Sequence, residues 1–303
     1  MKKPLARRLH SRLLKWYATD GRAALPWRIQ RNPYYTLVSE FMAQQTQIER
    51  VIAKFETFVA LFPDVATLAG ASTAAVLRAW KGLGYNARAV RLRRVAQIIV
   101  RDYGGSIPRE ATALEQLPGI GPYTAAAIRT FAFGIDDAPI DTNVRRVVGR
   151  LFLGPQAVAG TPSEIDCLAH EIVPAGRAHD WTSAMMDLGS TICTARTPKC
   201  LLCPLQTECV SAPIDPERTV VVRAMVRTAA QRYESTTRYA RGRLLDRLRE
   251  LPPGRRISLL DLHRELKPLL GGRTVDEVRA FVGALEKDGL VSCSEDHVAL
   301  PDD

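Results

Sequence analysis

Hydrophobic side chains recur at helical intervals along most of the first two thirds of the chain. Residues 4–20 predict an amphipathic helix, in which Leu5, Leu9, Leu13 and Trp16 alternate with basic side chains. The basic face of this helix either meets a polyanion or is simply solvated. Residues 36–60 predict one long helix, with Leu37, Phe41, Ile48, Ile52 and Phe55 toward a core.

The pattern between residues 61 and 188 also favours helices, and no strand-like alternation occurs between residues 61 and 133. Glycine and proline separate short helices predicted at 65–69, 73–80, 88–103, 111–116 and 123–133. Further helices are predicted at 143–151 and 162–172. The sequence therefore predicts a mainly α fold built as a helical bundle.

The pattern changes after residue 212. Residues 213–235 have little periodicity and predict a linker, whereas residues 236–303 predict a separate small domain. This domain is expected to contain helices at 238–251, 259–270 and 275–288, followed by a β-hairpin within 290–300. Such an order is typical of a winged-helix-like domain. Winged helices bind DNA or dock onto proteins, and the sequence leaves both roles open.

Composition narrows the class of partner. The 303 residues carry a formal charge of +10, which favours a polyanion, with nucleic acid ahead of an acidic membrane surface. No apolar run is long enough to span a bilayer, and no apolar stretch follows the basic N-terminus as in a secretion signal. We therefore expect a cytoplasmic, nucleoid-associated protein.

Four of the six cysteines form a cluster. Cys193, Cys200, Cys203 and Cys209 fall within 17 residues and are separated by six, two and five residues. A zinc site usually consists of two separated Cys-x-x-Cys pairs, whereas four cysteines also suit an iron–sulfur cluster. The close grouping of the four cysteines favours an inorganic centre over four thiols without metal.

A glycine- and proline-rich hairpin joins two predicted helices. Residues 118–122 read Pro-Gly-Ile-Gly-Pro, so Gly119 and Gly121 can expose backbone amides beside a helix N-terminus, where a phosphate binds well. Asp141 follows, between an apolar run and Asn143. Taken alone, the hairpin is an ordinary turn and Asp141 a helix cap.

Glu40 interrupts an otherwise apolar segment. Gln44 and Gln47 would share its helical face. Glu40 is either a carboxylate placed favourably near a helix N-terminus or a partly desolvated carboxyl that acts as a general acid. The segment alone does not decide between these two interpretations.

Taken together, the hairpin, the aspartate and the cysteine loop resemble the helix-hairpin-helix DNA glycosylases with an iron–sulfur loop, over residues 8–212. Residues 39–47 (Ser-Glu-Phe-Met-Ala-Gln-Gln-Thr-Gln) and 80–85 (Trp-Lys-Gly-Leu-Gly-Tyr) match those of the adenine-specific mismatch glycosylases. The chain departs from them at Thr142 and Asn86, which replace a glycine and a second tyrosine. These enzymes usually carry a pyrophosphatase-like domain that reads 8-oxoguanine, which nothing after residue 212 resembles, and the short tail looks like that of actinobacterial members.

The resemblance implies a domain arrangement and a cofactor. Residues 1–212 would form the glycosylase core, with a six-helix barrel at 26–133 that carries the hairpin 117–123. Residues 1–25 and 134–212 would form the cluster domain. The four clustered cysteines would hold a [4Fe–4S] cluster.

The resemblance also implies a reaction. The protein would act as a monomer on double-stranded DNA with mismatched or oxidised base pairs, flipping out and removing adenine opposite 8-oxoguanine or guanine. Tyr123 stands where lyases place a lysine, so the enzyme would be monofunctional. The resemblance implies that Glu40 is the general acid and that Asp141 stabilises the sugar cation, with Asn143 and Tyr123 orienting Asp141 and the intermediate. The implied DNA contacts are Arg28 to the extruded base, Gln45 and Tyr85 as wedges in the base stack, and Gly119 and Gly121 to a backbone phosphate.

Two alternatives remain open. A thymine or uracil mismatch glycosylase of the same superfamily can share Tyr123, Asp141 and the glutamate. A DNA-binding protein that has lost catalysis would keep the fold. The simultaneous presence of Glu40, Tyr123, Asp141 and Asn143 argues against the second alternative.

Overall fold

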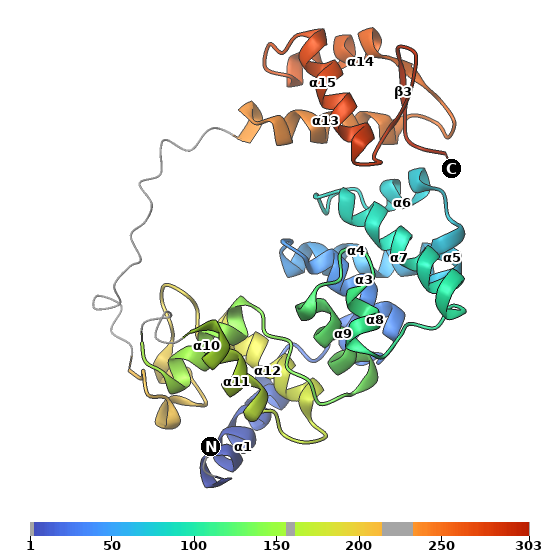
Figure 1. Ribbon diagram of the computed structural model, residues 1–303. Coiled ribbons are helices and arrows are strands. Elements are labelled where there is room, and N and C mark those ends of the chain that lie inside the picture. The colour runs from blue at the N-terminus through green and yellow to red at the C-terminus, as the bar shows by residue number, and fades with distance from the viewer. Residues whose placement is uncertain (1–2, 156–160, 214–232, 303) are drawn as a thin grey trace. The chain divides into compact units, whose positions relative to one another are not determined.

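The computed structural model describes residues 3–155, 161–213 and 233–302 (Figure 1). Most of them are helical, which confirms the predicted mainly α fold, and no described helix is long and apolar enough to cross a bilayer. The chain divides into two compact units. Unit 1 is drawn from Met1–Leu37, Arg109–Gln116 and Ile120–Val226, and unit 2 from Val38–Pro108, Leu117–Gly119 and Arg227–Asp303.

Unit 1 is helical throughout its described part. Besides the first residues of α3 (Pro33–Ala43), its elements are α1 (Lys3–Asp20), α2 (Pro26–Ile29), α8 (Ala111–Glu115), α9 (Pro122–Phe133), α10 (Thr142–Phe152), α11 (Pro162–Glu171), α12 (Ala178–Thr191) and the 3-10 turns η1 (Cys200–Leu202) and η2 (Gln206–Glu208). The helices predicted at 4–20, 143–151 and 162–172 are therefore confirmed to within two residues.

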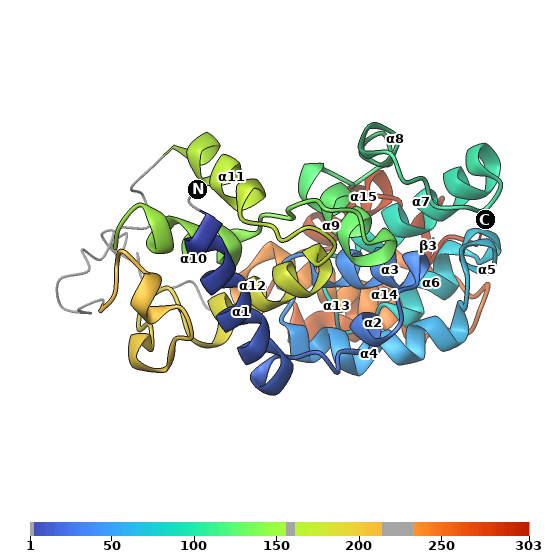
Figure 2. The same ribbon diagram turned by 90° about the horizontal axis from the view of Figure 1, so that it is seen from below.

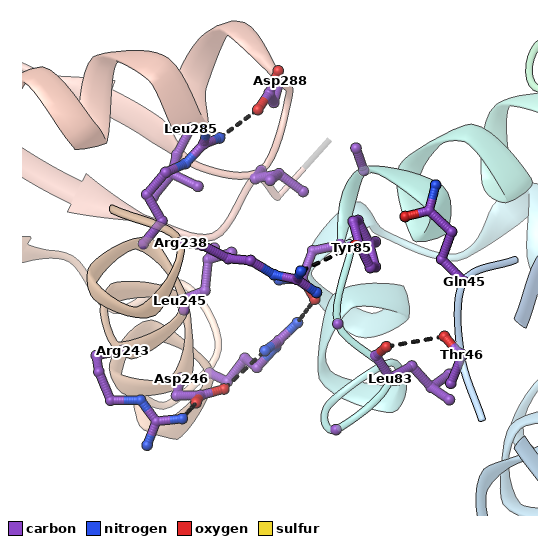
Figure 3. A pocket seen from close by; sticks show the side chains of 18 of the residues that line it. Gln45, Thr46, Leu83, Tyr85, Arg238, Arg243, Leu245, Asp246, Leu285 and Asp288 are labelled. Carbon is purple, nitrogen blue, oxygen red and sulfur yellow. Dashed lines mark hydrogen bonds and ion pairs between the residues drawn. The ribbon is translucent and has the colours of Figure 1, made fainter. Parts of the chain in front are cut away.

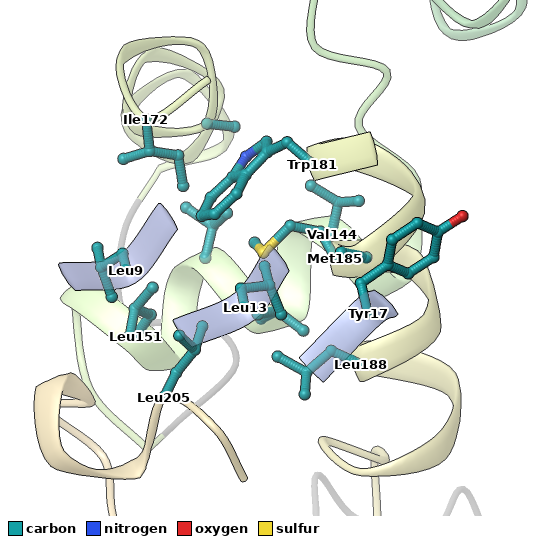
Figure 4. Packing of buried hydrophobic residues seen from close by; sticks show 14 of the residues in the cluster. Leu9, Leu13, Tyr17, Val144, Leu151, Ile172, Trp181, Met185, Leu188 and Leu205 are labelled. Carbon is teal, nitrogen blue, oxygen red and sulfur yellow. The ribbon is translucent and has the colours of Figure 1, made fainter. Parts of the chain in front are cut away.

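The core of unit 1 forms where α1, α10 and α12 pack together (Figures 2 and 4). Leu9, Leu13 and Tyr17 recur at intervals of four residues, so they share one face of α1 and are buried there. Trp181 and Leu205 belong to the same cluster. Because Leu205 lies between η1 and η2, the cysteine loop is fixed to this core.

Unit 2 contains the rest of α3 and the C-terminal elements. These are α4 (Ile48–Leu61), α5 (Val65–Gly70), α6 (Thr73–Ala79), α7 (Ala87–Tyr103), η3 (Tyr233–Ser235), α13 (Thr237–Glu250), β1 (Ile257–Ser258), α14 (Leu259–Leu266), η4 (Lys267–Leu269), α15 (Val275–Lys287), β2 (Ser292–Ser294) and β3 (His297–Ala299). Phe58 and Trp80 meet edge to face in its core, with ring centroids 5.8 Å apart.

The prediction of one long helix over 36–60 is wrong. The segment forms α3 and α4, separated by a turn in which Gln45 takes a left-handed φ of 55°. This φ cannot occur inside a right-handed helix. The break shifts the register, so Ile52 is 38% exposed instead of facing the core. Gln44 and Gln47 also lie outside the helices and do not continue the face of Glu40.

Residues 233–302, hereafter the C-terminal module, contain the three predicted helices and the predicted hairpin. The hairpin gains a third strand that the sequence did not indicate, because β1 has only two residues. The strands are antiparallel in the order β1-β3-β2, with Val298 opposite both Ile257 and Cys293. Residues 214–232 of the predicted linker lie outside the described residues, and the domain boundaries remain a prediction.

The C-terminal module packs on α6 within unit 2. The backbone amide of Ala74 donates to the carbonyl of Pro301 at 3.0 Å. Arg249 Nε donates to the carbonyl of Leu77 at 2.9 Å, and Arg78 donates to the carbonyls of Arg249 and Leu251 in return. These bonds engage backbone atoms on both sides, so the module has a defined position against α6 and the loop that follows it.

Candidate active site

Two exposed turns of unit 2 carry the predicted wedge residues. Gln45 lies between α3 and α4, and Tyr85 precedes α7 (Figure 3). Both have left-handed backbones, with φ of 55° and 43°. Such conformations are unfavourable for residues with a side chain and persist where the surrounding structure imposes them, often at functional sites. The structure therefore presents both residues on constrained turns.

A single buried arginine ties the two turns together. The guanidinium of Arg88 in α7 donates hydrogen bonds to the carbonyl oxygens of Phe41, Met42, Gln44, Leu83 and Gly84. It also donates to Oγ1 of Thr46 at 2.9 Å. Burial lowers the pKa of Arg88 to about 10, so the side chain is still cationic at neutral pH. Its planar fork of donors suits this set of carbonyls better than a lysine ammonium would.

Glu40 lies on α3, half-buried, in the turn of helix that precedes Gln44. Gln44 donates from its side chain to the carbonyl of Gly119 at 3.4 Å. Gly119 has a φ of 84°, and a Cβ added there would lie 3.4 Å from Phe41 and Arg91. Glycine is therefore favoured at position 119 by its backbone conformation, whereas a Cβ there would make an ordinary van der Waals contact.

In unit 1 the hairpin leads into α9. Gly121 is the N-cap residue, Pro122 occupies the first helical position and Tyr123 follows, half-buried. No side chain caps this helix end. Nothing crowds the site of a Cβ on Gly121, and the role of the two hairpin glycines as phosphate contacts remains a prediction.

Asp141 is the N-cap of α10, and its carboxylate is held on both oxygens. Oδ1 accepts from the amide of Val144 at 2.7 Å, and Oδ2 accepts from Nδ2 of Asn143 at 2.7 Å. Arg146 then donates to Oδ1 of Asn143 at 2.8 Å and to the carbonyl of Cys193 at 2.9 Å. The structure thus brings Asp141 and Asn143 together and fixes both.

Arg28 lies elsewhere in unit 1, on α2, and is bound by a carboxylate. Its guanidinium lies 2.8 Å from Oδ2 of Asp187, and Arg22 lies 2.7 Å from Oδ1 of the same carboxylate. Burial alone would raise the pKa of Asp187, but the two arginines outweigh it and hold that pKa below its usual value. The structure gives Arg28 a structural partner, and its role as a base contact remains a prediction.

The four cysteines of the cluster lie together around one small cavity, which is also lined by Arg150, Ile192 and Pro198. Arg150 is 2% exposed and donates to the carbonyls of Thr194 and Ala195, at 2.7 and 2.9 Å, and to Sγ of Cys193 at 3.5 Å. Burial raises the pKa of Cys203 to about 12, and the three other sulfurs act in the same direction.

The chemistry of the four cysteines is compatible with an iron–sulfur cluster. The cysteines surround one shared apolar cavity, and a [4Fe–4S] cluster takes one cysteine sulfur on each iron. Within the described part of the chain, no three or more His, Cys, Asp or Glu side chains are grouped closely enough to hold a single metal ion. The cluster therefore remains a prediction.

Two residues important to this geometry were missed from the sequence. Arg88 and Arg150 each occur among several arginines of an amphipathic helix, where a basic side chain normally marks the solvated face. Each falls on the buried side of its helix. The helical spacing could have identified both arginines. Arg88 lies four residues before Leu92 and Arg150 lies three residues after Val147, so each shares a helix face with an apolar residue.

Comparison with known proteins defines the class. The model of the HhH-GPD superfamily of base excision DNA repair proteins matches residues 38–175. An adenine DNA glycosylase of Mycolicibacterium smegmatis is 38% identical over 285 residues, which cover 94% of this chain and 92% of that protein. One from Mycobacterium tuberculosis is 44% identical over 248 residues, 78% of this chain and 77% of that protein. The chain therefore belongs to the HhH-GPD superfamily of base excision DNA repair proteins, and within it to the family of the adenine DNA glycosylases.

Solved structures agree with this assignment at the level of the fold. The structure of a thermostable thymine-DNA glycosylase matches with a TM-score of 0.62 at 30% identity, covering 68% of this chain and 96% of that chain. An endonuclease III in a non-covalent complex with DNA matches with a TM-score of 0.59 at 23% identity, covering 69% of this chain and 96% of that chain.

Proposed function

We propose that the protein is a monofunctional DNA glycosylase that removes adenine mispaired with 8-oxoguanine or guanine from double-stranded DNA. The observation that carries the proposal is the held carboxylate of Asp141, in a chain that aligns over 94% of its length with an adenine DNA glycosylase. The enzyme acts as a monomer, and its basic charge serves the DNA backbone.

Asp141 stabilises the sugar. Loss of adenine leaves an oxocarbenium-like sugar, which an ionised carboxylate stabilises either through its charge or as a transient covalent partner. The hydrogen bonds from Asn143 and from the amide of Val144 support this role, because they fix the orientation of the carboxylate. Tyr123 acts beside the intermediate.

Glu40 supplies the proton. Adenine is a poor leaving group until its ring is protonated at N7, so a second carboxyl must donate a proton while Asp141 stays ionised. Glu40 is half-buried on α3, with buried residues on both sides of it in the sequence, which supports a carboxyl set back from bulk water.

Tyr123 makes the enzyme monofunctional. Strand cleavage by a β-lyase needs an amine that forms a Schiff base with the opened sugar, and a phenol cannot form one. The product is therefore an abasic site in an intact strand.

The remaining residues bind and distort DNA. The glycosidic bond is inaccessible inside a duplex, so the adenine must be flipped out. Gln45 and Tyr85 enter the stack from their constrained turns, and Arg28 contacts the extruded base. The hairpin amides of Gly119 and Gly121 bind a backbone phosphate.

The cysteines hold a [4Fe–4S] cluster. Such a cluster, when bound, supplies a rigid brace for the loop and takes no part in the hydrolysis. Arg150 supports this assignment, because its guanidinium holds both the loop backbone and the sulfur of Cys193. Arg196 and Lys199, both exposed on this loop, would then contact the DNA backbone.

A single-turnover excision assay tests the proposal. Duplexes carry A:8-oxoguanine, A:G, T:G or U:G, and each reaction is analysed with and without alkali. We expect strand breaks at the adenine only, and only after alkali. Excision of T or U instead would assign the protein to the thymine mismatch enzymes, which the structural match to a thymine-DNA glycosylase makes the second candidate. Breaks without alkali would refute the monofunctional assignment.

A further inference from the structure

Arg150 of α10 lies at the cavity that the four clustered cysteines share. Its Nη1 donates to the carbonyl of Thr194 at 2.7 Å and to Sγ of Cys193 at 3.5 Å. Its Nη2 donates to the carbonyl of Ala195 at 2.9 Å. At the other end of the loop, Sγ of Cys209 lies 3.4 Å from the carbonyl oxygen of Arg150. This one residue therefore contacts both the first and the last of the four cysteines.

The positive charge of Arg150 is buried and has no carboxylate beside it. The residue is 2% exposed, and no aspartate or glutamate that the structure describes forms an ion pair with it. A buried cation is costly unless a negative charge lies close to it, and an arginine does not lose its charge. The other residues that line the cavity with Arg150 and the cysteines are uncharged. The cysteine sulfurs are therefore the groups at this cavity that can carry the compensating charge.

Arg88 shows how neutral acceptors alone satisfy a buried guanidinium. Its Nε, Nη1 and Nη2 all donate to carbonyl or hydroxyl oxygens. Arg150 differs, because its Nη1 reaches a sulfur and its buried Nε has no hydrogen-bond partner. Carbonyl oxygens therefore do not account for the whole environment of Arg150, and the sulfur of Cys193 is its additional acceptor.

We propose that Arg150 is the counter-ion of the cysteine sulfurs and that it protects the bound cluster from one-electron oxidation. The inference rests on the proposed [4Fe–4S] cluster. With four thiolates such a cluster is anionic, and it becomes less anionic when it gives one electron to an oxidant such as ferricyanide, which is thereby reduced to ferrocyanide. A buried cation beside the sulfurs favours the more negative form, so Arg150 makes removal of the electron less favourable.

Redox titration of the full-length, cluster-containing protein with ferricyanide, in the absence of DNA, tests the inference. Arg150→Met removes the charge and keeps an unbranched side chain. We expect the equilibrium constant for oxidation to rise about tenfold, which corresponds to a potential lower by about 59 mV for a one-electron couple. Arg150→Lys keeps the charge and should restore most of the wild-type potential. Arg196→Met, at an exposed arginine of the same loop, is the matched control and should leave the potential unchanged.

Iron and acid-labile sulfide analyses accompany each titration. A wild type without iron would refute the proposed cluster itself, whereas an iron-containing wild type with the same potential as Arg150→Met would overturn the counter-ion alone. An equal shift in Arg150→Met and Arg150→Lys would also overturn it, because the shape of the guanidinium and not its charge would then matter. If Arg150→Met holds no iron, the iron content of Arg150→Lys decides. A counter-ion predicts that the lysine variant retains iron, and loss of iron from both variants contradicts it.

Discussion

Arg249 donates a hydrogen bond of 2.6 Å from Nη2 to the side-chain oxygen of Asn86. Arg249 belongs to α13 of the C-terminal module and is 8% exposed, whereas Asn86 precedes α7. Asn86 occupies the position of a tyrosine in the adenine-specific enzymes that the sequence resembles. The replacement of that tyrosine has a structural consequence, because Asn86 accepts a hydrogen bond from Arg249, which anchors the module.

Arg249→Ala should therefore weaken the attachment of the module. The carbonyl of Leu77, the side chain of Asn86 and the carboxylate of Asp246 would all lose a donor, and we expect a loss of roughly 3 kcal/mol in the free energy of unfolding. Urea denaturation measures it. Asn86→Tyr should give a smaller loss, and Arg256→Ala, at an exposed position of the same module, should give none. Equal stability of all three variants would show that the contact does not hold the module.

A second prediction concerns Arg88, which holds the two turns that carry Gln45 and Tyr85. In Arg88→Lys the ammonium keeps the charge but has three donors, so several carbonyls now bound by the guanidinium would remain buried and unpaired. We expect a loss of about 3 kcal/mol in the free energy of unfolding and a lower rate of excision. Arg94→Lys, at an exposed position of the same helix, is the control in both measurements. Wild-type values for Arg88→Lys would show that charge alone suffices.

The helices could be predicted from the sequence because their apolar faces are regular, and α1, α10 and α11 follow the predicted ranges closely. The break at Gln45 could not be predicted. No glycine or proline marks it, and the left-handed turn is imposed by Arg88 from a helix more than 40 residues away. A long-range hydrogen bond of this kind leaves no local pattern.

The candidate site likewise has features that a local sequence pattern predicts and features that depend on long-range contacts. The hairpin turn and the helix-capping position of Asp141 could be predicted, because glycine, proline and a capping acid leave a local pattern in the sequence. The attachment of the C-terminal module was not, because it depends on buried arginines that resemble surface charge in the sequence. Likewise, the pairing of Arg28 with Asp187 joins residues 159 positions apart and gives no local signal.

The ion pairs of Asp187 predict how the free energy of unfolding depends on pH. Its carboxylate is 1% exposed and binds Arg22 and Arg28, which hold its pKa below the value of about 3.9 in an unfolded chain. A lowered folded-state pKa stabilises the protein above the unfolded value, and this stabilisation is lost as the pH falls through the folded value. Asp187→Asn should thus cost about 3 kcal/mol at pH 7 and progressively less below about pH 4.

Urea denaturation across pH 3 to 7 checks this dependence, where the range is chosen to bracket the usual aspartate pKa of about 3.9. Asp20→Asn, exposed at the end of α1, should change stability little at any pH. A constant difference between wild type and Asp187→Asn over the whole range would show that the carboxylate does not titrate with folding.

The cysteine loop predicts the metal content. Cys203→Ser removes one of the four sulfurs that line the shared cavity, and should abolish the brown colour and lower iron from about four per chain to well below one. Cys167→Ser, at an exposed cysteine outside the loop, should keep both. Iron and acid-labile sulfide analyses measure the outcome. A colourless wild type with one zinc per chain would refute the cluster.

Asp141→Asn separates the two roles that this residue can have. Asparagine caps helices as well as aspartate does, so α10 should keep its N-cap and the free energy of unfolding should change by less than about 0.5 kcal/mol. The charge is lost, however, and with it the stabilisation of the sugar cation. We expect excision of adenine to fall by at least about a thousandfold in single-turnover assays, while affinity for the duplex stays within a few fold.

Glu40→Gln completes this test, because it removes the proposed acid in unit 2 while Asp141 remains. It should abolish excision equally and also leave DNA binding intact, since an amide cannot protonate adenine. A purine that leaves without protonation should restore part of the rate in Glu40→Gln but not in Asp141→Asn. Rescue of both variants, or of neither, would contradict the division of labour between an acid at Glu40 and an ionised stabiliser at Asp141.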